Sequence, residues 1–213
     1  MTMLDVHQDS GGAVPAGAPV VERLRRRLDA GAAYFEQNAR PIAACAAAMA
    51  DRFFAGGTLL VMGAGAHATD AQHNAVEYVH PVLPGCRALP AISLSSDVAT
   101  VTGLLTGGDP GHVFAGQLRA LGRRGDIALA FGHLPLHGAV GRGLGVARDM
   151  GMLSVALLDG TESPDAQLAD HVLQVRCDDA VVARELHLAT SHILWELVHI
   201  VLNHRGIPAE ASP

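Results

Sequence analysis

The segment from Leu59 to Glu77 constrains the fold most strongly, because it predicts a buried strand, a turn of small residues and a helix in direct succession. The turn at 63–66 contains only Gly and Ala, which allows a sharp reversal and leaves backbone N–H groups at a helix start, where an anion can bind. In the helix, His73 and Glu77 are four residues apart and share one face. An anion site beside side chains that can bind a metal or transfer a proton is typical of a small-molecule site.

The rest of the chain alternates between short apolar runs and segments with helical spacing. The apolar runs fit buried parallel strands. Aromatic residues make up only 4% of the chain, so Ala, Leu and Val must fill the core. These features predict an α/β fold with a doubly wound parallel sheet flanked by helices. The expected strands are 58–62, 87–94, 126–131, 153–158 and 171–175, and the expected helices are 70–79, 97–105, 112–121, 139–150 and 181–204.

The N-terminal part of the chain predicts further helix. Apolar residues recur at helical spacing from Val20 to Phe54, with Pro41 between them. Because proline disrupts a helix interior but fits a first turn, we expect Pro41 to end one helix and begin another, which gives an N-terminal helical hairpin. We expect a tail at 1–19, which is rich in Gly, Pro and Ala, a single domain at 20–205 and a C-terminal tail at 206–213.

Charge and cysteine content narrow the classes of partner and compartment. The net charge of −6 and the pI near 6.0 do not favour nucleic acid or an anionic membrane surface. No apolar run is long enough to span a bilayer, and we expect no signal peptide. The three cysteines are odd in number and widely spaced, which argues against a disulfide framework or a cysteine zinc site and favours a reducing cytoplasm.

The closing helix carries a stripe of polar residues. Glu185, His192, Glu196 and His199 share one side of it, because seven residues are about two helical turns. Two carboxylates and two imidazoles on an otherwise apolar helix suit metal binding or proton transfer, and His192 is the candidate residue. The alternative is that these residues, like the pair on the first helix, are ordinary polar side chains of a helix surface.

Two loops are expected at the carboxyl edge of the sheet, where ligands bind in α/β folds. One follows the third expected strand and offers the imidazoles of His133 and His137 but few hydroxyls. The other contains Ser95, Ser96 and Asp97. The simpler interpretation of both is structural: a loop without a ligand in the first case, and a helix N-cap at Ser96 or Asp97 in the second.

Taken in this order, the motifs resemble those of a sugar isomerase (SIS) domain of the phosphoheptose isomerase type, over about 20–204. They are A-D-R-F-F-A-G-G at 50–57, D-A-Q-H-x-A-x-E at 70–77, L-S-S-D at 94–97 where the family has L-T-T-D, F-x-x-Q-x-x-A-L-G-R-R-G-D at 114–126, and E-L-H followed by H-I-L at 185–194.

The resemblance implies homodimers or homotetramers with ligand sites shared between subunits, and bound zinc in some members. It also implies conversion of sedoheptulose 7-phosphate, a carbohydrate derivative, into a heptose 7-phosphate by proton transfer beside the carbonyl. By position, His73, Glu77 and His192 are the expected metal ligands, and Glu77, His192 and Asp97 the expected catalytic residues. The expected substrate-binding residues are Gly63, Gly65, His67, Ser95, Ser96, His133, His137 and Arg184.

The chain departs from the family pattern at three places that contact substrate. The first loop lacks the Asn and Ser of G-N-G-G-S, the segment 132–137 lacks every hydroxyl of the phosphate loop S-T-S-G-N-S, and Arg184 replaces a glutamine. Two hypotheses therefore stay open. The chain is a phosphosugar aldose–ketose isomerase with an altered phosphate loop, or it is a non-catalytic or repurposed SIS protein that acts as a regulator, a partner-binding protein or a metal-binding accessory protein.

Overall fold

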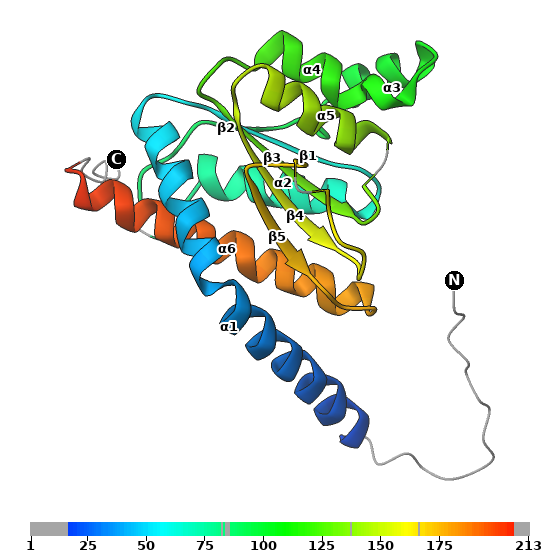
Figure 1. Cartoon of the computed structure of the whole chain (residues 1–213), viewed down its shortest axis with the longest axis vertical. Helices are drawn as coiled ribbons and strands as arrows, with labels where there is room; N and C mark the ends of the chain where they lie inside the picture. Colours follow the sequence, from blue (N-terminus) through cyan, green and yellow to red (C-terminus); the bar gives the residue numbers. More distant parts are fainter. Residues whose placement is uncertain (1–16, 82, 84–85, 137, 166, 207–213) are drawn as a thin grey trace.

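The computed structural model describes residues 17–206, except 82, 84, 85, 137 and 166. Within this range five parallel strands form one sheet in the order β2-β1-β3-β4-β5, with helices on both faces (Figure 1). The predicted doubly wound parallel sheet is confirmed. The strands are β1 (Leu59–Gly63), β2 (Ala91–Ser93), β3 (Ile127–His133), β4 (Leu153–Asp159) and β5 (His171–Val175).

The central strands are apolar along their whole length because helices cover both of their faces. Every residue of β1 and β4 is buried, as is every residue of β3 except the last. Leu59 of β1 pairs with Ile127 of β3, which pairs with Leu153 of β4. This register brings the carboxyl ends of the three strands to one edge of the sheet.

Two hydrophobic cores lie on opposite faces of the sheet. The first packs α1 (Ala18–Phe54), α2 (Ala66–Val79) and α6 (Ala180–His204) against one face. The second packs α4 (Val113–Leu121) and α5 (Gly138–Asp149) against the other, with α3 (Val98–Thr106) at its margin. A short 3₁₀ helix, η1 (Pro110–His112), precedes α4. Figure 1 shows the two groups of helices separated by the sheet.

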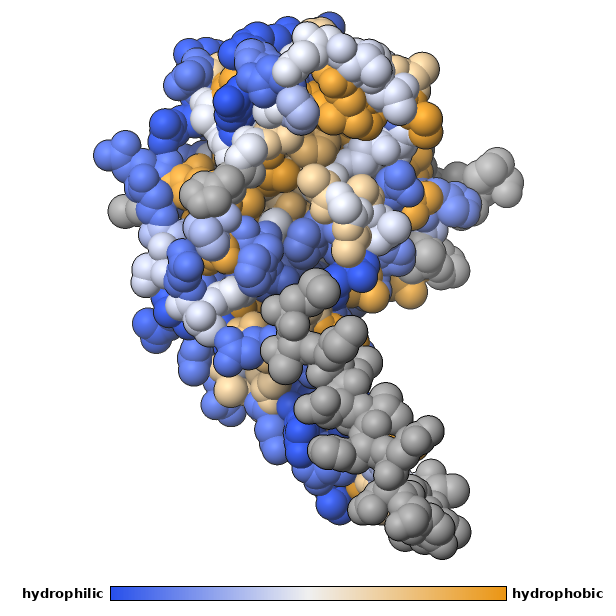
Figure 2. All heavy atoms as spheres, turned by 90° about the vertical axis from the view of Figure 1, so that its right-hand side faces the viewer, coloured by the Kyte–Doolittle hydropathy of each residue, from blue (hydrophilic) through white to orange (hydrophobic). Residues whose placement is uncertain are grey.

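The predicted N-terminal helical hairpin is wrong, because α1 is one helix of 37 residues with Pro41 inside it. Proline costs a helix about 3 kcal/mol through its missing N–H and its clash with the preceding turn. Packing on both sides of Pro41 outweighs this cost: Tyr34 before it and Ile42 and Cys45 after it are all buried in the first core. The N-terminal part of α1 extends beyond the body of the molecule (Figures 1 and 2).

Two other elements differ in length from the prediction. The helix α2 begins at Ala66, four residues before the expected start at 70, so the turn after β1 is shorter than predicted. The strand predicted at 87–94 is reduced to β2. Before β2, the chain is held by single hydrogen bonds, from Leu89 N to the Tyr78 carbonyl and from Leu59 N to the carbonyl of Pro90, which itself has no N–H to donate.

The described helices include none that is long and apolar enough to cross a membrane. The expected tails lie for the most part at 1–16 and 207–213, outside the described residues. The division of the chain into a tail, one domain and a second tail therefore stays a prediction.

Candidate functional site

The winding of the sheet reverses between β1 and β3. After β1 the chain enters α2 on one face of the sheet, and after β3 it enters α5 on the other face. The two loops that leave these neighbouring strands consequently diverge and open a crevice at the carboxyl edge. Open α/β sheets bind ligands at this position.

His73 and Glu77 of α2 lie against His192 of α6. The Nε2 atoms of His73 and His192 are 3.1 Å apart, and His73 Nε2 is 3.5 Å from Oε1 of Glu77. One potential ligand atom from each of the three residues lies within 4.8 Å of the others, and no other such group of three occurs among the described residues. The three residues are therefore brought together within one chain, although 119 positions separate the two histidines.

This arrangement follows from the packing of α2 and α6 on the same face of the sheet. Small Ala71 and Ala75 of α2 and apolar Leu194 of α6 are buried in the first core. His73 and His192 are half-buried and their ring nitrogens are in contact, so they lie in the seam where the two helices meet. The Glu77 side chain is 12% exposed and that of His73 41% exposed, which leaves the group open to solvent on one side.

The donor set fits a zinc-like ion. Two imidazoles and one carboxylate form a known catalytic zinc set, in which the fourth position is left for water or substrate. Zinc–nitrogen bonds of about 2.0–2.1 Å in tetrahedral geometry place two ring nitrogens about 3.3 Å apart. The separation of 3.1 Å between the two histidine nitrogens is close to that value.

Arg184 and His67 both contact the carboxylate of Asp70, and Arg184 and Asp70 also line an open hollow between α2 and α6. Arg184 donates to Asp70 through Nη2 at 2.8 Å and through Nε at 3.2 Å, and His67 Nδ1 is 3.3 Å from the same carboxylate. Burial opposes the ionisation of Asp70, but hydrogen bonds from His67 and Arg184 outweigh it and lower its pKa to about 2. The contacts of Arg184 thus join α6 to the first turn of α2.

His133 also has an acidic partner. Its Nδ1 is 2.6 Å from Oδ1 of Asp159, which ends the neighbouring strand β4. The carboxylate is buried while the imidazole is largely exposed, so the pair orients the ring at the edge of the sheet. The predicted substrate residue His137 lies outside the described residues.

The Ser-Ser-Asp loop after β2 has mainly structural contacts. Asp97 caps α3 by accepting hydrogen bonds from the backbone N–H and the hydroxyl of Thr100, and these lower the pKa of its exposed carboxyl. Ser95 donates from Oγ to the Gly63 carbonyl at 2.8 Å, and Ser96 N donates to the Ser93 carbonyl. No contact found among the described residues joins Asp97 to the group formed by His73, Glu77 and His192.

The turn after β1 is as tight as its small residues predict. A Cβ on Gly63 would lie 2.3 Å from the His67 carbonyl oxygen, and Gly65 has φ of +61°, so both positions favour glycine. The backbone N–H groups of His67 and Ala68 donate to the carbonyls of Ala64 and Gly65. Because these two donors already have local partners, the turn offers an anion fewer donors than the sequence predicts.

Sequence reasoning missed three buried or half-buried polar residues at this edge. Asp70 belongs to a recognised motif, but nothing in the sequence reveals its pairing with Arg184. Asp159 ends a strand without any other signal. His187 is fully buried, and neither of its ring nitrogens has a hydrogen-bond partner among the described residues. Burial lowers the pKa of His187 and outweighs the nearby Leu158 carbonyl and Asp159 carboxylate, which favour its charged form.

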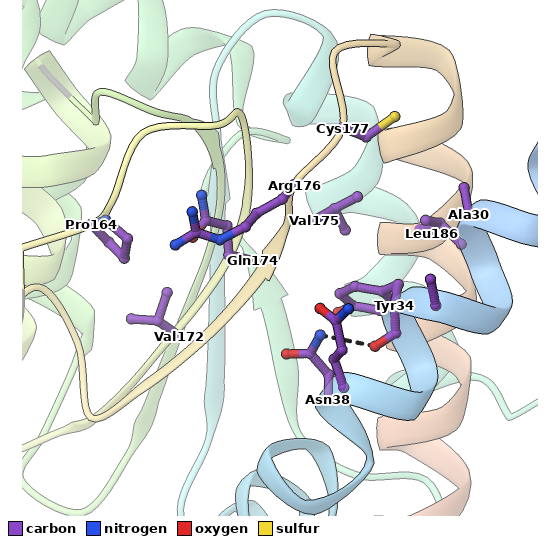
Figure 3. Close-up of a pocket in the computed structure, with 12 residues that line it drawn as sticks. Ala30, Tyr34, Asn38, Pro164, Val172, Gln174, Val175, Arg176, Cys177 and Leu186 are labelled. Carbon is purple, nitrogen blue, oxygen red and sulfur yellow. Dashed lines mark hydrogen bonds between the residues drawn. The ribbon is translucent and has the colours of Figure 1, made fainter.

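A groove of about 670 Å³ runs between α1 and β5 (Figure 3). Its polar side chains come from both elements: Asn38 of α1, and Gln174 and Arg176 from β5 and just beyond it. None of the predicted site residues lines it. Gln174 donates to the carbonyls of Gly160 and Glu162, so it holds the loop that follows β4.

Replacement of Asp70 by Asn tests the junction between α2 and α6. Because the pKa of Asp70 is lower in the folded chain than the usual 3.8, its ionised form stabilises the fold at neutral pH, and this contribution is lost as pH falls from about 5 towards 2. We expect Asp70→Asn to lower the free energy of unfolding by about 1–2 kcal/mol at pH 7, after allowance for the partly exposed Arg184. Urea unfolding at pH 7 and pH 3 measures the loss, which should be smaller at pH 3. Asp29→Asn, at an exposed position of α1, is the control, and equal effects of both variants would contradict this account.

Comparison with known proteins identifies close relatives in sequence. No family model matches the chain. It is 32% identical over 169 residues to the phosphoheptose isomerase of Thermodesulfovibrio yellowstonii, and the alignment covers 79% of this chain and 84% of that protein. It is 35% identical over 189 residues to the phosphoheptose isomerase of Pelobacter propionicus, and that alignment covers 86% of this chain and 99% of that protein.

Solved structures with the same architecture carry the same name. The phosphoheptose isomerase of Neisseria gonorrhoeae superposes with a TM-score of 0.76 at 23% identity, over 86% of this chain and 98% of that one. That of Francisella tularensis superposes with a TM-score of 0.74 at 26% identity, over 87% and 98%. The chain is therefore a phosphoheptose isomerase-like SIS-domain protein and belongs to the phosphoheptose isomerase family.

Proposed function

We propose that this protein is an aldose–ketose isomerase that acts on a phosphorylated sugar, with sedoheptulose 7-phosphate as the first candidate. The observation that carries the proposal is the convergence of His73, Glu77 and His192 from two helices. The relatives named phosphoheptose isomerase support the choice of substrate class. The reaction needs one base and one acid at adjacent positions, and the group supplies a carboxylate and two imidazoles.

Two side chains carry the proton transfers of the proposed reaction. Glu77 takes the proton from the carbon beside the carbonyl, and His192 gives a proton to the carbonyl oxygen, which produces an enediol. Return of the proton to the neighbouring carbon, and loss of one from the new carbonyl oxygen, completes the isomerisation. In the metal-free site, the contact between the ring nitrogens of His73 and His192 requires one ring to donate and the other to accept, so the two rings orient each other.

We further propose that the ligands His73, Glu77 and His192 bind zinc. Their donor types and spacing suit this ion, as described above. When bound, zinc would polarise the substrate carbonyl oxygen in place of a proton from His192, whose ring nitrogen would then be a ligand, and would make the adjacent proton more acidic. Asp97 stays a proposed active-site residue, although its contacts within the chain are those of a helix cap.

The phosphate of the substrate is the part for which the chain has the fewest free binding groups. We propose that the remaining predicted residues, Gly63, Gly65, His67, Ser95, Ser96, His133, His137 and Arg184, contact the sugar and its phosphate. Of the basic side chains among them, His67 and Arg184 face Asp70, and His133 faces Asp159. The charge of Arg184 is therefore partly neutralised, and both imidazoles already have an acidic partner, before a phosphate arrives.

This partial neutralisation favours a second candidate function. The loop after β3 lacks the hydroxyls of the family's phosphate loop, and the imidazole of His133 has an acidic partner within the chain. A non-catalytic SIS protein that binds a ligand, a metal or a regulatory partner would keep the fold without needing a phosphate loop. The three cysteines are free, which supports our proposal of a cytoplasmic location for either function.

We also propose that the chain forms a homodimer or homotetramer through α1. Val20, Val21, Leu24 and Leu28 are all more than 40% exposed on the part of α1 that extends beyond the body. Recurring apolar residues on an exposed helix favour burial against another helix. The groove beside the same helix offers further surface for a second copy (Figure 3).

The catalytic proposal predicts a large loss of turnover in Glu77→Gln. Glutamine keeps the size of the side chain but cannot accept the proton, so we expect kcat for sedoheptulose 7-phosphate to fall by about 100- to 10,000-fold with little change in KM. A steady-state assay with added zinc measures both. Glu162→Gln, in an exposed loop, should keep wild-type turnover. Absence of turnover by the unaltered protein, with and without zinc, would reject the isomerase and leave the second candidate.

The oligomer proposal predicts that charge on α1 releases single chains. In Leu24→Glu/Leu28→Glu two carboxylates would have to be buried in the interface, so the mass from light scattering should fall from that of a dimer or tetramer to that of one chain. Arg26→Glu, on the opposite side of the same stretch of helix, changes charge away from the apolar stripe and should keep the wild-type mass. A wild-type protein that is monomeric at every concentration tested would contradict the proposal.

A further inference from the structure

A second cavity, of about 310 Å³, opens at the carboxyl end of β1. Gly63, Gly65 and Ala68 form the wall on the side of α2, and Val101 and Leu105 of α3 form the opposite wall. The cavity lies at the crevice where the winding of the sheet reverses. Its position and size are those of small-molecule sites in α/β folds.

The walls of this cavity are almost entirely apolar. Of the described residues that line it, only Ser95 has a polar side chain, none has a charged one, and the others are Gly, Ala, Val, Leu, Pro and Phe. The Ser95 hydroxyl already donates to the Gly63 carbonyl, and the N–H groups of His67 and Ala68 have local acceptors. A phosphate that entered would lose its water without gaining enough donors to replace it.

The helix that covers the cavity is apolar but poorly buried. None of the nine residues of α3 is buried, and Val98 and Leu105 are 70% and 44% exposed. Figure 2 shows apolar surface gathered in the upper half of the view, on the side of the molecule that carries α3 and α5. Apolar surface that faces an open cavity stays in contact with water, so a ligand that covers it gains free energy from apolar burial.

The loop after β3 adds to this apolar character. Leu134 is 5% exposed and is part of the second core, against which Leu136 also packs. Leu136 Cδ1 lies only 2.5 Å from the position that a Cβ on Gly132 would occupy, so the loop folds back onto its own strand. Its leucines therefore pack into the core that lies on the same side of the sheet as the cavity.

We propose that this cavity binds an uncharged small molecule with an aliphatic or aromatic body. Volume, lining and position together favour such an occupant over an anion. Gly63, Gly65 and Ser95 line this cavity and are also among the residues proposed to contact the sugar phosphate, so the two ligands would compete for this part of the crevice. Binding of the apolar molecule does not depend on catalysis by Glu77 and His192. A binding measurement that needs no turnover therefore tests it separately from the proposed function.

Toluene is a suitable probe, followed by methyl NMR of full-length protein labelled at alanine methyl groups. Ala64, Ala68 and Ala139 line the cavity and act as reporters. We expect toluene to shift their signals saturably with a Kd of about 1 mM or lower, the affinity open to an apolar ligand of this size. Inorganic phosphate at the same concentrations should leave them unchanged.

Three variants make the result specific. Ala139→Phe fills the cavity and should weaken toluene binding at least tenfold, whereas Ala120→Phe, at an exposed position of α4 outside the lining, should not. Leu105→Asn keeps the partly exposed position but makes the wall polar, and should weaken binding about threefold or more even if Ala139→Phe fails to fold.

Phosphate-induced shifts without toluene-induced ones would overturn the proposal in favour of an anion site. Reporter shifts that follow protein concentration instead of toluene would overturn it in favour of a second copy, and equal effects of Ala139→Phe and Ala120→Phe would overturn it as non-specific binding.

Discussion

The contact between α2 and α6 determines what this molecule can do. Both helices pack on one face of the sheet, and their seam brings the ring nitrogens of His73 and His192 to 3.1 Å with Glu77 alongside. The buried residues of α2 include the small Ala71 and Ala75, which pack in the same core as α6. Asp70 and Arg184 join the same two helices about one turn from His73 and two turns from His192, so the site depends on a junction held by both apolar packing and charge.

Charge within the chain explains the unusual character of the carboxyl edge. The basic side chains nearest to a prospective phosphate already have acidic partners, Asp70 for Arg184 and Asp159 for His133. Such pairs orient the side chains but reduce the net positive field that attracts an anion. The neighbouring cavity is apolar. The edge of the sheet therefore combines a polar group suited to proton transfer with a surface better suited to carbon than to phosphate.

Sequence patterns predicted the sheet and most helices because the central strands β1, β3 and β4 are buried on both faces and most helices have one apolar side. They predicted the meeting of His73 and His192 only through the resemblance to a family, since spacing on two separate helices does not say how those helices pack. The break at Pro41 was wrong because local propensity was outweighed by tertiary packing. The pairing of Arg184 and the burial of His187 depend on contacts between distant elements, which no local pattern reveals.

Isothermal titration of the metal-free protein with Zn²⁺ tests the central claim most directly, because the claim is that three side chains form one site. The account predicts about one ion per chain, binding weakened about 100-fold or more in His73→Ala, and unchanged binding in His112→Ala, whose imidazole is exposed on η1. Absence of zinc binding, or equal loss in both variants, would contradict it.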